Sequence, residues 1–476
     1  MNIVQAAKDP NLFKPFIGED LTSWHNWFAA LRVLYGLPVR KPASLELIKK
    51  CTGRDINLLP KGGFDTALFL VGRRSGKSKI AAIIGAFEAG MSGREKLLSK
   101  GEMGVVAVIA PTRKQGRIVK NYLRAIFDAT SLLRNEIESE TQEGFLLSNG
   151  VLVEILVGDW RAVRGYTLLA AIVDEIAFFG LDAESKVRSD TELIRAVTPS
   201  LATCQGKLIC IGSPYAKKGW SYQQYKKNFG NNNGKVLVWN SPSRTMNPTI
   251  SQYIIDAALE EDRQAALSEY MGQFRDDVCI FLPREVIESV VVKGRKELLP
   301  NQSISYFGFA DVSGGRSDDA ALAIGHKNAS KVIIDFIQRY KPPHSPYQVI
   351  GSMSEELRRY GIKKITGDNY SAEFVKQAFQ SNGIAYQKSE LPKSQLYLEL
   401  LPRICSGEIE LLDDEISINQ LASLERRTRS GGKDIIDHPQ GGMDDIANAI
   451  AGVACTTSAK QIIIGGLFRD RNKMCI

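Results

Sequence analysis

A short glycine-rich segment near residue 75 has the residue types that bind phosphate. Residues 71–78 read VGRRSGKS; an apolar run precedes them and the helix-favouring stretch KIAAIIGAFEAG follows them. In such an arrangement, backbone N–H groups and the helix N-terminus cradle phosphates. We expect Lys77 to reach the β- and γ-phosphates of ATP and Ser78 to ligate Mg²⁺. Gly72 comes one residue later than in the common G-x-x-x-x-G-K-[ST] spacing. The candidate nucleotide-binding residues of this loop are Gly72, Arg73, Arg74, Ser75, Gly76, Lys77 and Ser78.

Two acidic residues at the end of a later apolar run predict hydrolysis of the bound nucleotide. The run LLAAIVDE ends in Asp174 and Glu175. We expect Asp174 to hold Mg²⁺ through water and Glu175 to polarise the attacking water. A further run, 208–211, is followed by Gly-Ser-Pro at 212–214. It would lie beside these strands, where it could sense the γ-phosphate or simply turn.

Arginines precede that acidic strand in the segment WRAVRGYT. Arg161 or Arg164 could stabilise the charge on a transferred phosphate, in the same chain or from a neighbouring subunit. The alternative is a solvated or salt-bridged arginine.

The second half of the chain carries aspartates where predicted strands and helices end or begin. Asp311 closes one strand, Asp368 closes another, and Asp444 and Asp445 start the last helix. Each alone is ordinary for a cap or a turn. Together they predict a carboxylate cluster, which is costly unless a cation lies within it. Two divalent cations could then activate water and stabilise the leaving oxygen of a phosphodiester. Asp318 or Asp319 could supply one more ligand.

A basic, glycine-rich segment just before those last aspartates is typical of contact with a nucleic-acid backbone. Residues 426–433 read RRTRSGGK. We expect a flexible loop that contacts phosphates without reading bases; the alternative is a solvated loop. The candidate DNA-binding residues are Arg426, Arg427, Arg429 and Lys433.

The elements that must position the first group alternate between strand and helix. Residues 1–60 look helical, with aromatic and aliphatic residues from Trp24 to Leu34 on one face. This alternation predicts a parallel sheet with crossover helices, followed by a helix over 251–276. The predicted strands are Ala67–Val71, Val105–Ala110, Val151–Val157, Leu168–Val173 and Lys207–Ile211.

A different order begins near residue 303. Three antiparallel-looking strands, 305–310, 320–325 and 331–336, precede alternating helices and strands and a final apolar helix, Asp445–Cys455. This is the order of an RNase H-like domain. The predicted organisation is therefore an ATPase domain at 1–281, a linker at 282–302, a nuclease domain at 303–457 and a tail at 458–476.

Composition places the chain in a broad class. It has 476 residues, 44% of them hydrophobic and 24% charged, and 61 Lys+Arg against 53 Asp+Glu give a net charge of +8. These values exclude a disordered or fibrous protein, and the moderate excess of positive charge permits a polyanionic partner. No uncharged apolar run reaches the ~18 residues of a membrane span. Seven cysteines without a C-x-x-C pair predict reduced thiols in a cytosolic protein.

The combination of a GRRSGKS loop, an IVDE strand, a GSP motif and three aspartates in an RNase H-like domain resembles the large terminase subunit of tailed bacteriophages. The resemblance covers roughly residues 12–454. It implies an α/β protein with an N-terminal P-loop (RecA/ASCE-like) ATPase domain built on a parallel sheet, and a C-terminal RNase H-like nuclease domain. By resemblance, the aromatic stretch around residues 24–36 would be an N-terminal adenine-side segment of the ATPase domain, and Arg164 would act on a neighbouring subunit's nucleotide.

The resemblance also implies partners and cofactors. They are ATP, Mg²⁺ with Mn²⁺ as a substitute in the nuclease site, double-stranded DNA, the portal protein of a procapsid, a small terminase subunit and further copies of the chain in a pentameric ring. The expected location is the host cytoplasm, transiently on the portal, without a membrane.

Two other classes of protein remain open at this point. One is a host DNA-repair ATPase-nuclease or helicase-like protein, although a helicase needs motifs on a second RecA-like domain. The other is a DNA-binding scaffold with inactive sites, against which the intact Lys77, Glu175, Asp311 and Asp368 argue.

Overall fold

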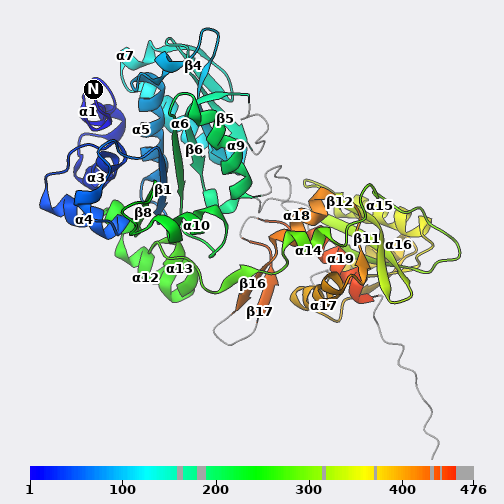
Figure 1. The fold of residues 1–476 in the computed structure, drawn as a ribbon. Coiled ribbons are helices and arrows are strands. Elements are labelled where there is room, and N and C mark those ends of the chain that lie inside the picture. The colour runs from blue at the N-terminus through cyan, green and yellow to red at the C-terminus, as the bar shows by residue number, and fades with distance from the viewer. Residues whose placement is uncertain are drawn as a thin grey trace, which may run out of the picture. The chain divides into compact units, whose positions relative to one another are not determined.

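The protein folds into two units, shown in the computed structural model of Figure 1. The structure describes residues 1–157, 165–179, 189–313, 318–368, 373–428, 434–439 and 442–456. The first unit comprises Met1–Phe281 and Ser423–Gly442, and the second comprises Leu282–Ala422 and the chain from Met443 onward. The domain limits drawn from the sequence stay a prediction, and the contacts assign residues 423–442 to the first unit rather than to the second.

The first unit is built on an eight-stranded sheet with the order β3-β4-β5-β2-β6-β7-β1-β8. The strands from β5 to β8 in this order are parallel, and β3 and β4 add an antiparallel edge. β7 lies between β6 and β1, which confirms the predicted neighbourhood of the Gly-Ser-Pro strand. The strands are β1 (Thr66–Val71), β2 (Gly104–Ala110), β3 (Ile137–Glu140), β4 (Gly144–Leu147), β5 (Leu152–Val157), β6 (Thr167–Asp174), β7 (Lys207–Gly212) and β8 (Val236–Ser241).

Helices cover both faces of this sheet because its central strands are apolar on both sides. In β1, Phe69 packs into one core with α1, α3, α5 and α6, whereas its neighbour Leu68 packs into a second core with α9 and α10. The first face carries α1 (Ile3–Lys8), α2 (Lys14–Ile17), α3 (His25–Leu34), α4 (Pro42–Thr52), α5 (Lys77–Gly90), α6 (Arg113–Asp128) and α7 (Ser131–Arg134); the second carries α9 (Asp190–Ala202) and α10 (Gly219–Asn228).

The predicted helix over 251–276 is wrong in its extent. The structure has α11 (Ser243–Met246), α12 (Gln252–Glu261) and α13 (Arg263–Glu269). Asp262 separates the last two because its carboxylate caps α13 by accepting from the Ala265 N–H at 3.0 Å. Gly272 then adopts a φ of +71°, and the chain leaves the helical path.

The basic segment at 426–433 is only partly a loop. Its first residues form β16 (Glu425–Thr428), which pairs antiparallel with β9 (Val278–Ile280) and β17 (Asp434–Asp437) in a three-stranded sheet of the first unit. Glu425 begins this strand and is fully buried, where it accepts a hydrogen bond from the Tyr215 hydroxyl at 2.6 Å. Sequence reasoning missed this strand because its residues are mostly charged.

The second unit has a mixed six-stranded sheet with the order β14-β13-β10-β11-β12-β15. β10, β11 and β12 are antiparallel, as predicted, and β13 joins β10 in parallel. The element order confirms the predicted succession of three antiparallel strands and then alternating helices and strands. The strands are β10 (Tyr306–Asp311), β11 (Ala320–Asn328), β12 (Lys331–Tyr340), β13 (Lys364–Gly367), β14 (Ala385–Lys388) and β15 (Ile409–Glu410).

Helices pack on the two faces of the second sheet. α15 and α16 share a core with Ala310 of β10. α19 packs against β10 and β11 on the other face, where Gly452 is so close to Phe309 that a Cβ would lie 2.1 Å from its ring. The predicted linker 282–302 contains α14 and a β-bridge between Val291 and Leu411, so it belongs to this unit. The helices are α14 (Arg284–Glu288), α15 (Pro346–Arg359), α16 (Glu373–Ser381), α17 (Lys393–Ser406), α18 (Glu415–Ser423) and α19 (Asp445–Thr456).

Among the residues that the structure describes, no helix has both the length and the apolar character needed to cross a membrane.

Candidate active sites

The phosphate-binding loop of the sequence lies between β1 and α5, at the carboxyl edge of the parallel sheet. Gly76 precedes α5 with a φ of +95°, a conformation that a residue without Cβ adopts at little cost. Lys77 opens the helix and is 7% exposed. Its Nζ donates a hydrogen bond to Ser213 Oγ at 3.3 Å and lies 3.5 Å from Glu175 Oε1. The predicted lysine, glutamate and serine therefore converge from three adjacent strands of one sheet.

Close packing explains why position 72 of the loop is a glycine. A Cβ on Gly72 would lie 2.2 Å from Ser243 Oγ and 2.7 Å from the carbonyl oxygen of Tyr270. The loop is held there from outside, because Ser243 Oγ donates to the Arg73 carbonyl at 2.7 Å and Asn247 Nδ2 donates to the Arg74 carbonyl at 2.8 Å. Residues 243–270 thus clamp the loop in a path that leaves no room for a side chain at position 72.

A cavity of about 480 Å³ opens in front of this loop. Trp24, Trp27 and Tyr122 form an aromatic side of it, and the Trp27 indole N–H donates to the Ser75 carbonyl at 2.8 Å. Of the predicted nucleotide-binding residues, those from Arg74 to Ser78 line the cavity. Its size and its mixture of aromatic faces with cationic groups suit a nucleotide.

Three predicted residues take other positions. Gly72 and Arg73 do not line this cavity, and Arg73 Nη2 instead lies 3.2 Å from Glu269 Oε1. Asp174 ends β6, is 5% exposed and is not among the residues that line the cavity. Arg161 and Arg164 lie outside the described residues.

The electrostatics at the end of β6 favour a cation. Burial, and then the negative charge of Glu175, raises the pKa of Asp174 to about 7. Glu175 has a φ of +49°, an uncommon conformation for a residue with a side chain. Strained backbone of this kind clusters at functional sites, and here it accompanies the approach of the Glu175 carboxylate to Lys77.

In the second unit, two predicted carboxylates follow adjacent parallel strands. Asp311 ends β10, and Asp368 directly follows β13, where its N–H donates to the Ala310 carbonyl at 3.2 Å. The side-chain amide of Asn448, on α19, donates to Asp311 Oδ2 at 2.8 Å and to Asp368 Oδ2 at 3.0 Å. One buried amide therefore bridges two candidate metal ligands.

The third carboxylate is Asp445, at the start of α19. Burial and then the charge of Asp445 raise the pKa of Asp311 to about 7, with a smaller contribution from Asp368. Burial and then the charge of Asp444 likewise raise the pKa of Asp445 to about 7. Like-charge repulsion of this kind raises the pKa of carboxylates that could share a cation.

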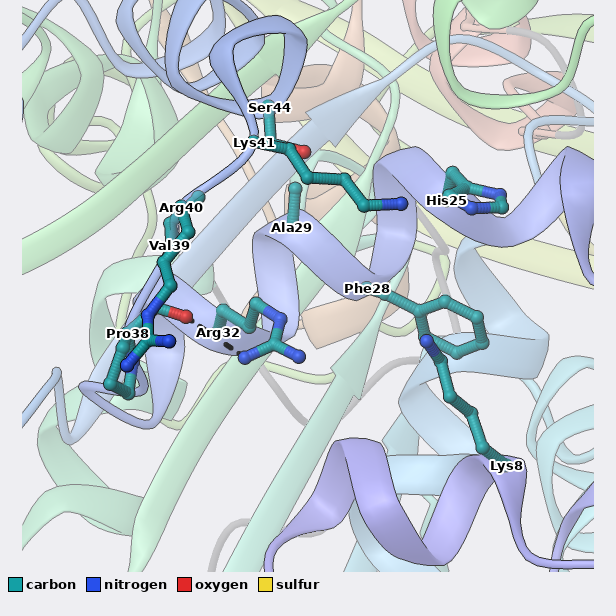
Figure 2. A pocket seen from close by; sticks show the side chains of 10 residues that line it. All are labelled: Lys8, His25, Phe28, Ala29, Arg32, Pro38, Val39, Arg40, Lys41 and Ser44. Carbon is teal, nitrogen blue, oxygen red and sulfur yellow. Dashed lines mark hydrogen bonds between the residues drawn. The ribbon is translucent and has the colours of Figure 1, made fainter.

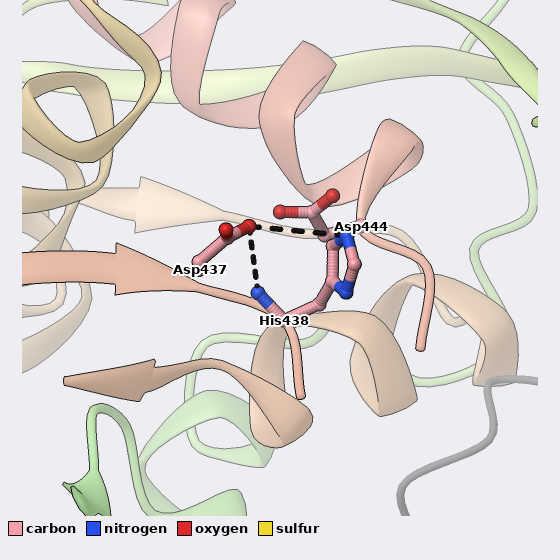
Figure 3. A group of neighbouring side chains, drawn as sticks. All are labelled: Asp437, His438 and Asp444. Carbon is pink, nitrogen blue, oxygen red and sulfur yellow. Dashed lines mark hydrogen bonds and ion pairs between the residues drawn. The ribbon is translucent and has the colours of Figure 1, made fainter. Parts of the chain in front are cut away.

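The Asp444 carboxylate is bonded to two residues of α17. Its Oδ1 is 2.6 Å from Lys393 Nζ, and its Oδ2 accepts from the Tyr397 hydroxyl at 2.8 Å. Figure 3 draws Asp444 just before α19; the other two residues drawn, Asp437 and His438, lie at the end of β17 in the first unit and pair with each other. Of the two candidate aspartates, the geometry therefore favours Asp445 as the metal ligand and Asp444 as an anchor for α17.

The additional ligands considered from the sequence are placed differently. Asp319 is fully buried and forms an ion pair with Arg339, so its charge is already compensated. Asp318 is exposed.

The residues of the second-unit site fit a divalent cation. Asp311, Asp368 and Asp445 supply the hard oxygen donors that Mg²⁺ and Mn²⁺ prefer. The Asn448 side chain is fully buried, and its Oδ1 has no hydrogen-bond partner among the described residues. A buried oxygen without a hydrogen-bond partner, close to carboxylates whose pKa is raised, is consistent with a site for a bound cation.

The predicted DNA-binding arginines have partners within the first unit. Arg427 Nη2 donates to the His438 carbonyl at 3.0 Å and lies 3.4 Å from Glu425 Oε2. The Arg426 guanidinium lies 5.8 Å from the centre of the Phe281 ring. Arg429 and Lys433 lie outside the described residues. Contact of this segment with DNA stays a prediction.

Sequence reasoning missed Asn448 and the anchors Lys393 and Tyr397 as a connected set. A signal for Asn448 was present, because it follows Asp445 by three residues and so shares a helix face with it. The pairing of Lys393 with Asp444 had no such signal, since 51 residues separate them.

Comparison with known proteins finds no protein-family model and no curated protein that matches this chain. Solved structures do match. The HK97 bacteriophage large terminase is 13% identical with a TM-score of 0.39, over 88% of this chain and 96% of that chain. A large terminase from a thermophilic bacteriophage is 12% identical with a TM-score of 0.39, over 90% of this chain and 98% of that chain.

A third match covers only the second half. The large terminase nuclease from thermophilic phage G20c with bound magnesium is 15% identical with a TM-score of 0.32, over 36% of this chain and 94% of that chain. These values assign no residue role here, and the roles given above rest on the geometry of this chain. The solved structures that the chain resembles are nevertheless large terminases, the family that its motifs resemble.

Proposed function

We propose that this protein is an ATP-driven motor that translocates double-stranded DNA and cuts it, as the large subunit of a viral DNA-packaging terminase. One observation carries the proposal: a single chain combines the Lys77–Glu175–Ser213 convergence at a nucleotide-sized cavity with the Asn448-bridged carboxylates of a second unit. The first arrangement suits hydrolysis of a nucleoside triphosphate, and the second suits hydrolysis of a phosphodiester.

In the ATPase reaction the ion pair of Lys77 with Glu175 has a specific role. Lys77 Nζ lies 3.5 Å from Glu175 Oε1. When the β- and γ-phosphates bind, Lys77 turns to them, and Glu175 is released to accept a proton from the attacking water. Ser213, which directly follows β7 and accepts a hydrogen bond from Lys77, would contact the γ-phosphate. The Mg²⁺ that accompanies ATP would be held by Ser78 and, through water, by Asp174.

In the nuclease reaction Asp311, Asp368 and Asp445 would hold the divalent cations. When bound, these cations activate water and stabilise the leaving oxygen of the phosphodiester. Asn448 orients the first two carboxylates through its two N–H donors. Lys393 and Tyr397 keep Asp444 turned away, so that the start of α19 presents Asp445 to the site.

The decisive test measures both reactions on one purified chain. We expect ATP turnover that duplex DNA stimulates, and nicking of plasmid DNA in Mn²⁺ or Mg²⁺ without regard to sequence. Absence of both activities in a well-folded chain would reject the enzymatic proposal. Turnover of ATP with strand separation, rather than movement along intact duplex, would favour the helicase-like alternative.

The packaging role extends to partners. We propose that the chain works in the host cytoplasm as a pentameric ring on the portal of a procapsid, with a small terminase subunit that selects the viral DNA. Arg164 would then act on the nucleotide of the neighbouring subunit. Raised ATP turnover on addition of portal rings, lost in an Arg164→Ala variant, would support this assembly.

The sheet of the second unit argues against a helicase. A helicase needs a second RecA-like parallel sheet, whereas the described strands of the second unit form a mixed sheet with three antiparallel neighbours. The described residues therefore offer one sheet of the kind that binds a motor nucleotide, and an oligomer would supply the others.

A further inference from the structure

A basic cavity in the N-terminal helices of the first unit has no role in either reaction. It measures about 420 Å³ and is lined by α1, α3, the segment after α3 and the start of α4. Figure 2 shows its cationic side chains around a common space, with Phe28 and Ala29 on one wall. The basic residues that line the cavity are Lys8, His25, Arg32, Arg40 and Lys41.

Four of these residues are lysines or arginines, which carry a positive charge at neutral pH, and the lining has no acidic side chain. The four cations are Lys8, Arg32, Arg40 and Lys41. None of these four cations forms an ion pair with a residue that the structure describes; Arg32 Nη1 donates only to the Pro38 carbonyl, at 2.9 Å. The pKa of Lys8 is lowered, first by burial and then by the charges of Arg32 and Lys41. Like charges held together without a counter-charge raise the free energy of the folded chain, and a bound anion would remove that cost.

The backbone adds to this positive potential. α4 begins at Pro42, with Lys41 as its N-cap, no side-chain cap and no acidic residue in its first turn. The N-terminus of an 11-residue helix carries partial positive charge, and here it faces the cavity beside Ser44.

The basic cavity is separate from the nucleotide cavity. The two share no lining residue, and α3 divides them. Trp27 of this helix faces the phosphate-binding loop, whereas Phe28 and Arg32 face the basic cavity.

We propose that this cavity binds a free polyphosphate, such as pyrophosphate or the phosphate chain of a nucleotide. Four cations in a concave space match a compact anion with several negative charges. The convex surface of a DNA duplex could contact the exposed Arg40 and Lys41 at the rim, but it could not enter a space of this size to reach Arg32. The Lys8 ammonium already lies 4.9 Å from the centre of the Phe28 ring, so recognition is of phosphates rather than of a stacked base.

The test uses the full chain and pyrophosphate as the probe. Binding is measured by calorimetry in a Lys77→Ala background, which removes phosphate binding at the nucleotide loop. We expect one saturable site whose affinity falls steeply between 50 and 200 mM salt. Arg40→Ala with Lys41→Ala should weaken binding at least tenfold, because it removes two of the four cations of the cavity. Both side chains are exposed and make no ion pair with described residues, so their loss should leave the fold intact. The matched control is Lys49→Ala with Lys50→Ala, which removes two exposed charges from the other end of α4.

Three outcomes would overturn the proposal. The first is no saturable binding of pyrophosphate to a folded chain, as judged by its thermal melt. The second is an equal loss in both double variants, which would mean that general electrostatics and not the cavity attracts the anion. The third is binding of a short DNA duplex, lost in the Arg40/Lys41 variant, without binding of pyrophosphate, which would make this surface a contact for the DNA backbone.

Discussion

At the scale of single residues, the charge on Glu175 decides turnover in the first unit. Glu175→Gln keeps the shape of the side chain but removes its ability to accept a proton. We expect ATP to bind and turnover to fall roughly 100-fold or more, the usual contribution of a general base. The measurement is steady-state ATP turnover alongside nucleotide affinity. Unchanged turnover would place the base elsewhere.

Asn448 allows a second prediction at this scale. Asn448→Ala leaves Asp311 and Asp368 without the donor they share, and we expect it to cost about 1–3 kcal/mol of metal-free stability. Metal-dependent nicking should fall with it. The matched control, Asn328→Ala, changes an exposed asparagine at the end of β11 and should leave both properties unchanged. Equal effects of the two variants would contradict a positioning role for Asn448.

The clustered carboxylates predict a pH dependence. Because the folded-state pKa of Asp311 is about 7, above its ordinary 3.8, the folded chain holds an extra proton between these values. Stability without metal should therefore fall as the pH rises through this window. Thermal melts in EDTA at pH 6 and pH 8 should show a larger loss for wild type than for Asp311→Asn.

Added Mn²⁺ should raise the thermal stability of wild type more than that of Asp311→Asn, because wild type has the extra carboxylate that binds the cation. Nicking by Asp311→Asn should be abolished. A variant that cleaves DNA normally, or that responds to Mn²⁺ as wild type does, would show that the carboxylate site is misassigned.

At the scale of elements, the path of the phosphate-binding loop depends on the segment 243–270 that packs against it. Gly72→Ala would place a methyl group 2.2 Å from Ser243 Oγ and 2.7 Å from the Tyr270 carbonyl. We expect nucleotide affinity to drop at least tenfold as the loop is displaced. Gly62→Ala is the control, because a Cβ there has no neighbour within 4 Å.

A companion variant makes this prediction sharper. Adding Ser243→Ala to Gly72→Ala removes the hydroxyl contact, together with the hydrogen bond from Ser243 to the Arg73 carbonyl, and leaves the Tyr270 carbonyl in place, so affinity should stay low. Ser243→Ala alone is the control for the lost hydrogen bond. Full recovery in the double variant would show that the backbone of residues 269–270 does not constrain the loop.

At the scale of the whole molecule, each site is built within its own unit. Lys77→Ala should therefore abolish ATP hydrolysis and leave metal-dependent nicking largely intact, while Asp311→Asn should do the reverse. Turnover and nicking measured on the same preparations decide this. Loss of nicking in a well-folded Lys77→Ala chain would mean that the two reactions depend on each other chemically.

The features that the sequence alone predicts are local ones. Strand and helix positions on the central sheets follow from apolar periodicity, and the loop around Lys77 and the aspartates at strand ends follow from residue type and from the shared edge of parallel strands. These features need only neighbours along the chain and the regular geometry of a sheet.

The contacts that sequence reasoning could not predict join residues that are distant in sequence. The clamp on Gly72, the bridge from Asn448 to two aspartates and the capture of Asp444 by Lys393 all involve partners on separate elements. The charged strand β16 likewise forms because β9 and β17 complete its hydrogen bonds. Periodicity cannot reveal such contacts, because packing and burial of specific side chains select them only after the elements have come together.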